Sequence, residues 1–409
     1  MKAGAAVGVL LAFLASAGSL PAQTPLLRSG DFSLDLGGYA LSLTGIHDAG
    51  FSLPSGESRS GFHSDVARLE WRARWGDELL LEAHDRVQVR VTTSTSALSG
   101  SVAGFGVSAV PGRAVDLESV WIDDDRLRAW HDVDRLALTV YTDLADVTVG
   151  RQAITWGTSL LFPVADLWAQ FSPFELDTEE KPGADALRVL AYPARGLEVD
   201  GVVADRGSRG VSVGGRAAWS LASADVWAGA GRLWNEAMAM GGITWIFENA
   251  KLRGEAVVSR DLDRDQWLDP RITLGADWIG SRLSLTAEYH FNGLGAASAS
   301  DYPARLSSAS FQRGESYYLG RQYVGALASW AVDAQQRIHV SGSVLVNLGD
   351  PSAALLPDVS WDVGQAARIS VGGLLTAGRD PSFAGAVPEL RSEYGTYGSL
   401  GYGRMSIYF

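Results

Sequence analysis

The chain has 409 residues, a formal net charge of −13, 46% hydrophobic and 20% charged residues, and no cysteine. This composition excludes a disordered chain, a disulfide framework and thiolate metal sites. Beyond the N-terminus no long apolar run would form a transmembrane helix, and the acidic balance argues against a nucleic-acid partner.

The first 22 residues have the pattern of an export signal. Lys2 forms a short positive region, residues 3–20 are uncharged, and a small-residue cleavage site follows Ala22, with residues 15–17 as the alternative site. A permanent membrane anchor is the other interpretation of this segment. We expect residues 1–22 to be a cleaved signal peptide and residues 23–409 to form the mature protein.

From about residue 31 onward, apolar and polar residues alternate with a period of two. Leu69, Trp71 and Ala73, for example, alternate with Glu70 and Arg72. This alternation predicts strands with one apolar face and one polar face. The predicted strands lie near 33–45, 62–76, 79–93, 130–142, 146–157, 184–193, 196–205, 210–220, 223–234, 236–248, 250–260, 270–280, 282–292, 319–333, 335–349, 354–363, 366–378 and 396–409.

Short and long connections between the predicted strands fall at alternate positions along the chain. Every second connection is short, as at Gly76-Asp77 and Gly280-Ser281. The long connections, which include 46–61, 94–129, 158–183 and 293–318, all fall at the other positions. A membrane barrel with short periplasmic turns and long external loops has this asymmetry, whereas a propeller would need a repeated motif. We predict an all-β, transmembrane antiparallel β-barrel of about eighteen strands, with sixteen as the alternative.

The last strand reaches the final residue, because Met405, Ile407 and Phe409 alternate with polar or amphipathic residues. It is expected to close against the first strand, so that both chain ends lie on the periplasmic side. The terminal aromatic resembles the sorting signal that the barrel-assembly machinery of Gram-negative bacteria reads in outer-membrane proteins. The resemblance implies that Phe409 is an assembly signal and that the barrel lies in outer-membrane lipid and lipopolysaccharide.

Arginines gather on one face of two neighbouring predicted strands. Guanidinium groups remain charged, so an arginine wall in a pore favours anions or solutes with acidic groups. The alternative is a wall that salt bridges neutralise and that only stiffens the barrel. The residues predicted to form this pore wall are Arg68, Arg72, Arg74, Arg86 and Arg90, interleaved with Glu70 and Glu82.

The stretch from Val149 to Leu187 departs from simple alternation. It contains "GRQAITWG" and then "PVADLWAQFSPFELDTEEKPGADALRV". These motifs resemble a group of uncharacterised bacterial outer-membrane porin-like proteins, although Ala169-Gln170 stands where Asn-Pro is common in that group. The resemblance implies a transport-type barrel and no particular solute.

Residues 158–182 combine prolines with aromatic residues and follow the fifth predicted strand on the long-loop side. We therefore expect a compact loop that folds inward and constricts the lumen, with an external cap unrelated to permeation as the alternative. The buttress is predicted to be Arg151, Gln152 and Trp156, and the loop residues that matter are predicted to be Asp166, Trp168, Phe171, Phe174, Glu179 and Glu180.

Other chemistry has weak support in the sequence. It has no Gly-x-Ser-x-Gly elbow and no paired histidines at metal-ligand spacing, so we expect no enzyme, no cofactor and no metal centre. The acidic runs at 123–125 and 261–269 lack the glycine and glutamate of a calcium loop; solvated acids or lipopolysaccharide bridged by divalent ions fit them better.

The sequence thus predicts an outer-membrane channel for passive diffusion of small hydrophilic solutes, with anionic ones favoured if the arginines are not neutralised. A closed-lumen barrel that serves as a structural or surface-interaction protein is the alternative. A barrel hydrolase is the second alternative, and it would need a Ser–His pair on the lipid-facing wall. The solute and the oligomeric state are left open.

Overall fold

The protein was analysed as a computed structural model that describes residues 24–51, 58–93, 112–383 and 389–409. The predicted signal peptide lies outside the described residues. Within them the chain forms a single sheet of 21 strands, in which β21 pairs with β2 and closes the sheet into a barrel. Three strands, β1, β5 and β14, are short additions at the ends of barrel strands, so eighteen strands form the closed wall.

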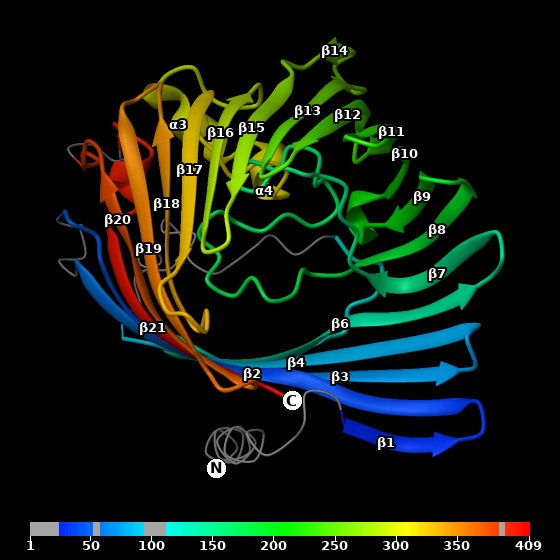
Figure 1. The fold of residues 1–409 in the computed structure, drawn as a ribbon. Helices are drawn as coiled ribbons and strands as arrows, with labels where there is room; N and C mark the ends of the chain where they lie inside the picture. Colours follow the sequence, from blue (N-terminus) through cyan, green and yellow to red (C-terminus); the bar gives the residue numbers. More distant parts are fainter. Residues whose placement is uncertain (1–23, 52–57, 94–111, 384–388) are drawn as a thin grey trace.

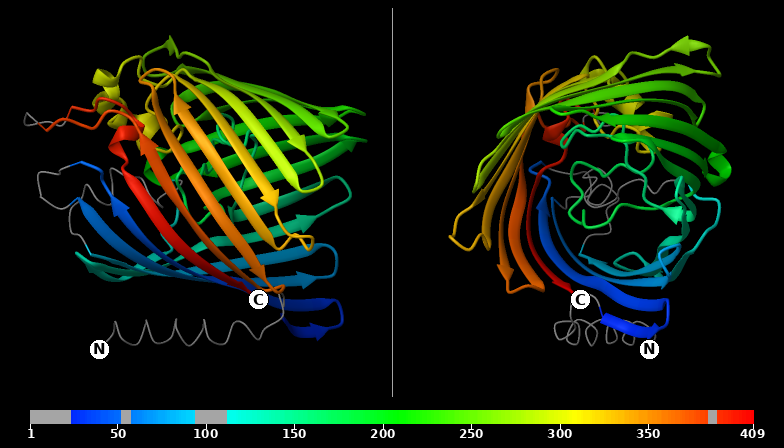
Figure 2. Two further views of the ribbon diagram at one scale, coloured as in Figure 1. Left: turned by 60° about the vertical axis from the view of Figure 1, so that its left-hand side comes forward. Right: turned by 45° about the vertical axis from the view of Figure 1, so that its right-hand side comes forward.

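All eighteen wall strands are antiparallel to their neighbours, and Figures 1 and 2 show the tilted ring that they form. They are β2 (Phe32–Asp48), β3 (Arg59–Trp75), β4 (Leu79–Thr92), β6 (Leu127–Tyr141), β7 (Ala145–Gln152), β8 (Ala184–Ala194), β9 (Leu197–Asp205), β10 (Val211–Ser220), β11 (Ala224–Leu233), β12 (Glu236–Phe247), β13 (Ala250–Asp261), β15 (Arg271–Ile279), β16 (Leu283–Asn292), β17 (Gln322–Ala331), β18 (Ile338–Asn347), β19 (Ser352–Val363), β20 (Ala367–Ala377) and β21 (Ser399–Tyr408).

The remaining elements lie at the ends of the barrel. β1 (Thr24–Ser29) pairs with the start of β2, β5 (Glu118–Asp124) pairs with β6, and β14 (Gln266–Trp267) pairs with β13. Short helices are η1 (Gly207–Arg209), η2 (Ala299–Asp301), α3 (Tyr302–Leu306), α4 (Ala309–Gln312) and η3 (Tyr394–Thr396). No helix among the residues that the structure describes is long and apolar enough to cross a membrane.

The predicted fold class is confirmed, and the count is eighteen rather than sixteen. Each predicted strand corresponds to one wall strand, and the short turns and long connections lie at opposite ends of the barrel. The fifth predicted strand, 146–157, was too long, because β7 ends at Gln152 and the chain then turns inward. β5 and the helices α3 and α4 were missed, since they lie within segments that were interpreted as loops.

The outer face carries a belt of tryptophans near the turn end of the barrel. Each of these side chains is exposed, although tryptophan is usually buried in water-soluble folds. Aromatic belts mark the level at which a barrel meets the membrane–water interface. The belt consists of Trp75, Trp219, Trp245, Trp278, Trp330 and Trp361, which lie at or near the ends of β3, β10, β12, β15, β17 and β19.

The two ends of the wall meet at Gly38 and Phe409. Gly38 donates a backbone hydrogen bond of 2.8 Å to Phe409 and accepts one of 3.0 Å from it. Gly38 has a φ of +151°, and a Cβ there would lie 2.0 Å from the carbonyl oxygen of Arg68. The Phe409 ring packs over this glycine and is only 1% exposed, so the last residue of the chain is part of the closed sheet.

Candidate functional site: the lumen loop and the arginine wall

The connection between β7 and β8, residues 153–183, lies inside the barrel, and we call it the lumen loop. Figures 1 and 2 show it winding within the ring of strands. Along the loop, its contacts run from β9 through β13 to β16, return to β13 and to the segment after β9 at residues 164–168, and then reach β21, β4 and β6. The loop is therefore held by strands on several sides of the inner wall.

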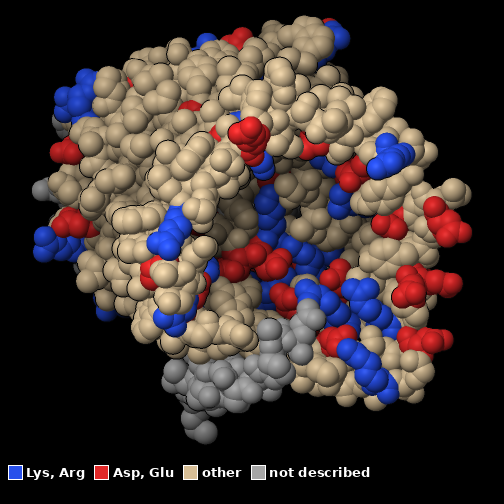
Figure 3. Space-filling view, viewed as in Figure 1, with Lys and Arg blue, Asp and Glu red and all other residues tan. Residues whose placement is uncertain are grey.

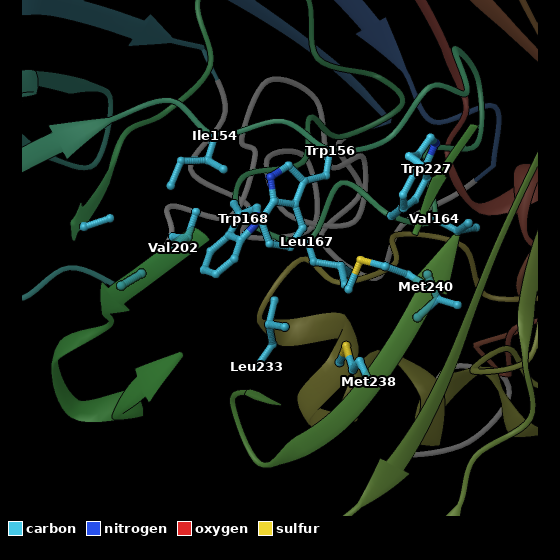
Figure 4. Packing of buried hydrophobic residues seen from close by; sticks show 14 residues of the cluster. Ile154, Trp156, Val164, Leu167, Trp168, Val202, Trp227, Leu233, Met238 and Met240 are labelled. Carbon is cyan, nitrogen blue, oxygen red and sulfur yellow. The ribbon is translucent and has the colours of Figure 1, made fainter. Parts of the chain in front are cut away.

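The first wall contact of the loop is with Asp200 on β9, which is fully buried. Its carboxylate accepts a 2.7 Å hydrogen bond from Trp156 Nε1 and bonds of 3.0 and 2.7 Å from Arg188. Trp156 meets Trp168 edge to face, with ring centroids 5.1 Å apart. Figure 4 shows both rings in the apolar cluster that the loop shares with β8, β9 and β11–β13. This part of the loop is a packed core rather than a flexible cap.

Glu255 on β13 and Glu288 on β16 hold the next part of the loop by its backbone. Glu255 accepts hydrogen bonds from the N–H groups of residues 158, 159 and 164, at 2.8, 3.3 and 2.9 Å. Glu288 accepts those of residues 160, 161 and 162, at 2.8, 3.0 and 3.0 Å. Arg253 compensates the charge of Glu288 at 2.9 Å. Because these N–H groups have no strand partner, the two buried carboxylates provide the acceptors that they need.

Aromatic contacts hold the middle of the loop. The Phe162 ring lies 5.1 Å from that of Tyr318, whose hydroxyl donates a 2.7 Å bond to the carbonyl of residue 161. Phe174 packs against Tyr397 at 5.0 Å and against Tyr394 at 6.2 Å. Both tyrosines belong to the β20–β21 connection, so that external segment rests directly on the lumen loop.

The last part of the loop, residues 175–181, lies against the arginine wall. Here the loop supplies the acceptors and the wall supplies the donors, which reverses the arrangement at Glu255 and Glu288. The contacts are Arg404 Nη1 to the Leu176 carbonyl at 3.0 Å, Arg86 Nη2 to Asp177 at 2.8 Å, the Tyr408 hydroxyl to Glu179 at 2.8 Å, and Arg135 Nη2 to Glu180 at 3.4 Å.

The loop also closes on itself through Asp166. Its carboxylate binds Lys181 Nζ, which donates a second bond of 3.1 Å to Thr155 and lies 5.9 Å from the centre of the Phe171 ring. Burial raises the pKa of Asp166 to about 6, although the Lys181 charge opposes this increase. This contact joins the beginning, the middle and the end of the loop.

The predicted buttress residues lie where β7 ends. Arg151 is 2% exposed, and it binds Asp185 at 2.7 Å and the carbonyl of Val133 at 2.7 Å. Gln152 donates to the carbonyls of Thr148 and Ala186, both at 3.2 Å. These contacts tie β7 to β6 and β8 immediately before the chain turns into the lumen.

Arg68 is the most enclosed of the predicted wall residues. It faces inward but is fully buried, and it binds Asp134, Glu70 and His84. Arg72 pairs with Glu70 at 2.8 Å. Salt bridges within the wall therefore neutralise these guanidiniums, as in the alternative interpretation of the arginine pattern.

The remaining predicted wall residues are more accessible. The Arg86 side chain is 31% exposed, Arg90 lies 5.8 Å from the ring of Trp130, and Arg74 is exposed near the turn end of β3. Glu82 is 3.4 Å from Arg72. Figure 3 shows a hollowed face of the barrel in which basic and acidic side chains gather, while much of the visible outer surface is uncharged.

Sequence reasoning missed the anchors of the loop on the opposite wall. Asp200, Glu255 and Glu288 look like ordinary polar positions in alternating strands. One feature of the sequence could have indicated these anchors. Each is an acidic residue on the lumen face of a strand, and a buried acid requires hydrogen-bond donors. Nothing in the sequence, however, tells which donors those are, because backbone N–H groups have no residue-type pattern.

A second polar cluster lies on the opposite, outward face of β2 and β3. Thr44 Oγ1 is 2.7 Å from His63 Nδ1, and His63 Nε2 is 3.0 Å from Asp65. Thr44 is exposed and Asp65 is buried. Within the described part of the chain, no three acidic or histidine side chains converge in a way that could hold a metal ion.

No family model matches the sequence, and no curated protein matches it. Among solved structures, the barrel is similar to a BenF-like porin from Pseudomonas fluorescens Pf-5, with a TM-score of 0.55 and 8% identity over 92% of this chain and 98% of that chain. It is also similar to OccK7 (OpdD) of Pseudomonas aeruginosa, with a TM-score of 0.54 and 10% identity over 93% and 99% of the two chains. For OccAB3 of Acinetobacter baumannii the values are 0.55 and 8% over 91% and 99%. At these identities the likeness concerns the fold, which is that of a porin barrel over nearly the whole chain.

Proposed function

We propose that this protein is an outer-membrane porin of a Gram-negative bacterium, through which small hydrophilic solutes diffuse passively. The observation that carries the proposal is that the lumen loop lies inside a barrel with the porin fold and is held by wall strands on several sides. In this proposal the loop narrows the lumen, solutes pass beside it, and Phe409 serves as the assembly signal of the barrel.

Two arginines support a preference for anionic solutes. Among the described residues, neither Arg90 nor Arg404 has a carboxylate within ion-pair distance, although many other arginines of the barrel do. Strand pairing places them in one row across four neighbouring strands, through Arg90 with Ser64, Ser64 with Leu43, and Leu43 with Arg404. Guanidiniums without an ion-pair partner on the wall of a narrowed lumen attract anions.

Single-channel recording of the refolded mature protein in a planar bilayer tests this function. We expect stable conductance steps, a reversal potential that favours anions, and larger steps after deletion of residues 160–178. A silent wild-type barrel that conducts only after the deletion would instead indicate a closed lumen and a structural or surface-interaction role.

The Thr44–His63–Asp65 chain favours a hydrolase as a second candidate. A hydroxyl, an imidazole and a carboxylate in series can activate the hydroxyl as a nucleophile toward an ester. The contact uses threonine, whereas the sequence-based alternative required serine. Labelling of the folded barrel by a fluorophosphonate probe, lost in Thr44→Val and retained in Ser42→Ala, would support this candidate; absence of labelling would remove it.

A further inference from the structure

The lumen loop is attached to the wall in two chemically opposite ways. Over residues 158–164, loop N–H groups bind carboxylates that belong to the wall, and Glu255 and Glu288 are 2% and 3% exposed. Over residues 175–181, carboxylates that belong to the loop bind arginines of the wall. Only the second kind of contact can be replaced by a dissolved anion, because the anion would take the place of the loop carboxylate.

The accessibility of the two attachments differs in the same sense. Side-chain exposure is 31% for Arg86 and 9% for its partner Asp177, and it is 9% for Arg135 and 36% for its partner Glu180, so one member of each pair is accessible to solvent. Glu288 and Arg253, by contrast, are 0% and 5% exposed as side chains. Ion pairs that water reaches contribute little and exchange readily, whereas breaking a buried charged contact is costly.

We propose that Asp177 and Glu180 are tethered competitors for the anions that the channel admits. This inference rests on the proposed porin function and adds the device that sets anion affinity. A carboxylate or phosphate group that reaches Arg86 or Arg135 displaces the loop carboxylate and loosens residues 175–181. Residues 158–164 stay attached to Glu255 and Glu288, so the loop moves only where it faces Arg86 and Arg135, and the lumen widens there.

The contact of Leu176 with Arg404 fits the same device. Arg404 binds the Leu176 carbonyl at 3.0 Å and the Ser370 hydroxyl at 3.2 Å, both neutral acceptors. An anion is a stronger acceptor for a guanidinium than either group. Arg404 is thus a further position at which an anionic solute would outcompete the loop, and its loop partner, Leu176, directly precedes Asp177 in the sequence.

The experiment compares the wild type, Asp177→Asn and Glu198→Gln in planar bilayers, with each variant first confirmed as a folded barrel by its heat-modifiable gel mobility. Glu198→Gln is the matched control, because Glu198 also pairs with a barrel arginine, Arg216, at 2.5 Å but belongs to the wall, and Arg216 contacts the loop only at a neutral acceptor, the Trp156 carbonyl at 3.3 Å. Acetate and inorganic phosphate are titrated against a constant chloride background, and the concentration that half-maximally changes the current is measured.

We expect Asp177→Asn to lower the half-maximal anion concentration about fivefold, which corresponds to the loss of one solvent-accessible ion pair. The variant should also show fewer anion-dependent current transitions than the wild type. Glu198→Gln should leave the half-maximal concentration near the wild-type value. An unchanged value in Asp177→Asn, or an equal shift in both variants, would overturn the competitor role while leaving a conducting porin in place. A wild-type barrel that conducts no ions would overturn both the competitor role and the proposed function.

Discussion

The indole N–H of Trp156 donates a 2.7 Å hydrogen bond to Asp200, and this bond attaches the start of the lumen loop to β9. The same carboxylate binds Arg188 on β8. One buried acid thus links two wall strands with the loop. Its removal would leave an indole and a guanidinium without their acceptor, which is costly in a buried position.

Asp200→Ala is expected to destabilise the barrel by about 3 kcal/mol, because Arg188 and Trp156 lose their buried acceptor. The measurement is equilibrium unfolding in guanidinium chloride from detergent micelles, followed by tryptophan fluorescence. Asp225→Ala, at an exposed position of β11, is the control and should stay within about 0.5 kcal/mol of the wild type. Equal stabilities of the two variants would contradict the anchoring role of Asp200.

Glu288→Ala is expected to release residues 160–162 and to increase single-channel conductance, since three N–H groups lose their acceptor. Glu288→Gln keeps an acceptor oxygen but loses the charge, so its conductance should lie between those of the wild type and Glu288→Ala. Glu248→Ala, in an exposed turn, should conduct like the wild type. A Glu288→Ala channel with wild-type conductance would show that other contacts suffice to hold the loop.

The external mouth should respond to pH through Glu393. Burial raises the pKa of this carboxyl group from 4.5 to about 7, and hydrogen bonds from Tyr323, Asn347 and the Leu319 N–H oppose the shift only in part. A raised pKa means that the folded state prefers the protonated acid. The stabilisation is complete below about pH 4.5 and is lost as pH rises through 7.

The pH-dependent change in the free energy of unfolding is about 3 kcal/mol, because the pKa of Glu393 rises from 4.5 to about 7 on folding. We expect the denaturant concentration at the midpoint of unfolding to decrease when the pH is raised from 5 to 8 in the wild type. The same change in pH should lower this concentration much less in Glu393→Gln. Glu389→Gln, an exposed position of the same connection, should keep the wild-type dependence. If Glu393→Gln and the wild type show the same pH dependence, the titrating group lies elsewhere.

Gly38→Ala is expected to impair closure of the barrel. Its φ of +151° is unfavourable for other residues, and the added Cβ would meet the carbonyl oxygen of Arg68. The expected cost is at least about 2 kcal/mol, seen as loss of the heat-modifiable form on gels. Gly401→Ala is the matched control, because a Cβ there meets nothing within 4 Å. Normal folding of Gly38→Ala would mean that β2 can shift away from β3 at little cost.

The wall of the barrel could be predicted from the sequence because its cause is local. Each strand separates an apolar environment from a polar one, so alternation is written into every wall strand, and hairpin lengths report the side of the barrel. β5 has only seven residues and ends in Asp123-Asp124, so it has no readable alternation. Its pairing exists because β7 stops at Gln152 and leaves the outer part of β6 without a neighbour.

The lumen loop was predicted in outline, and its inward fold is observed. Its path could not be predicted, because the contacts that define it join backbone groups to Glu255 and Glu288, far away in the sequence. The same limit applies to Arg68, which has the right face but is buried by Asp134 at a bulge of the β4–β6 pairing. Alternation predicts the side of the wall on which a residue lies, but it does not predict how deeply other side chains bury that residue.

The contacts of the lumen loop with the last strand also impose an order on folding. Its contacts with Arg404 and Tyr408 span 228 and 229 residues, and both partners belong to the last strand of the chain. Contacts of such separation form late, after the entropy of the intervening chain has been lost. The loop can complete these contacts only once β21 has joined β2, so a docked loop indicates that the barrel is closed. The time at which residues 175–181 become protected from proteolysis would therefore mark the final step of assembly.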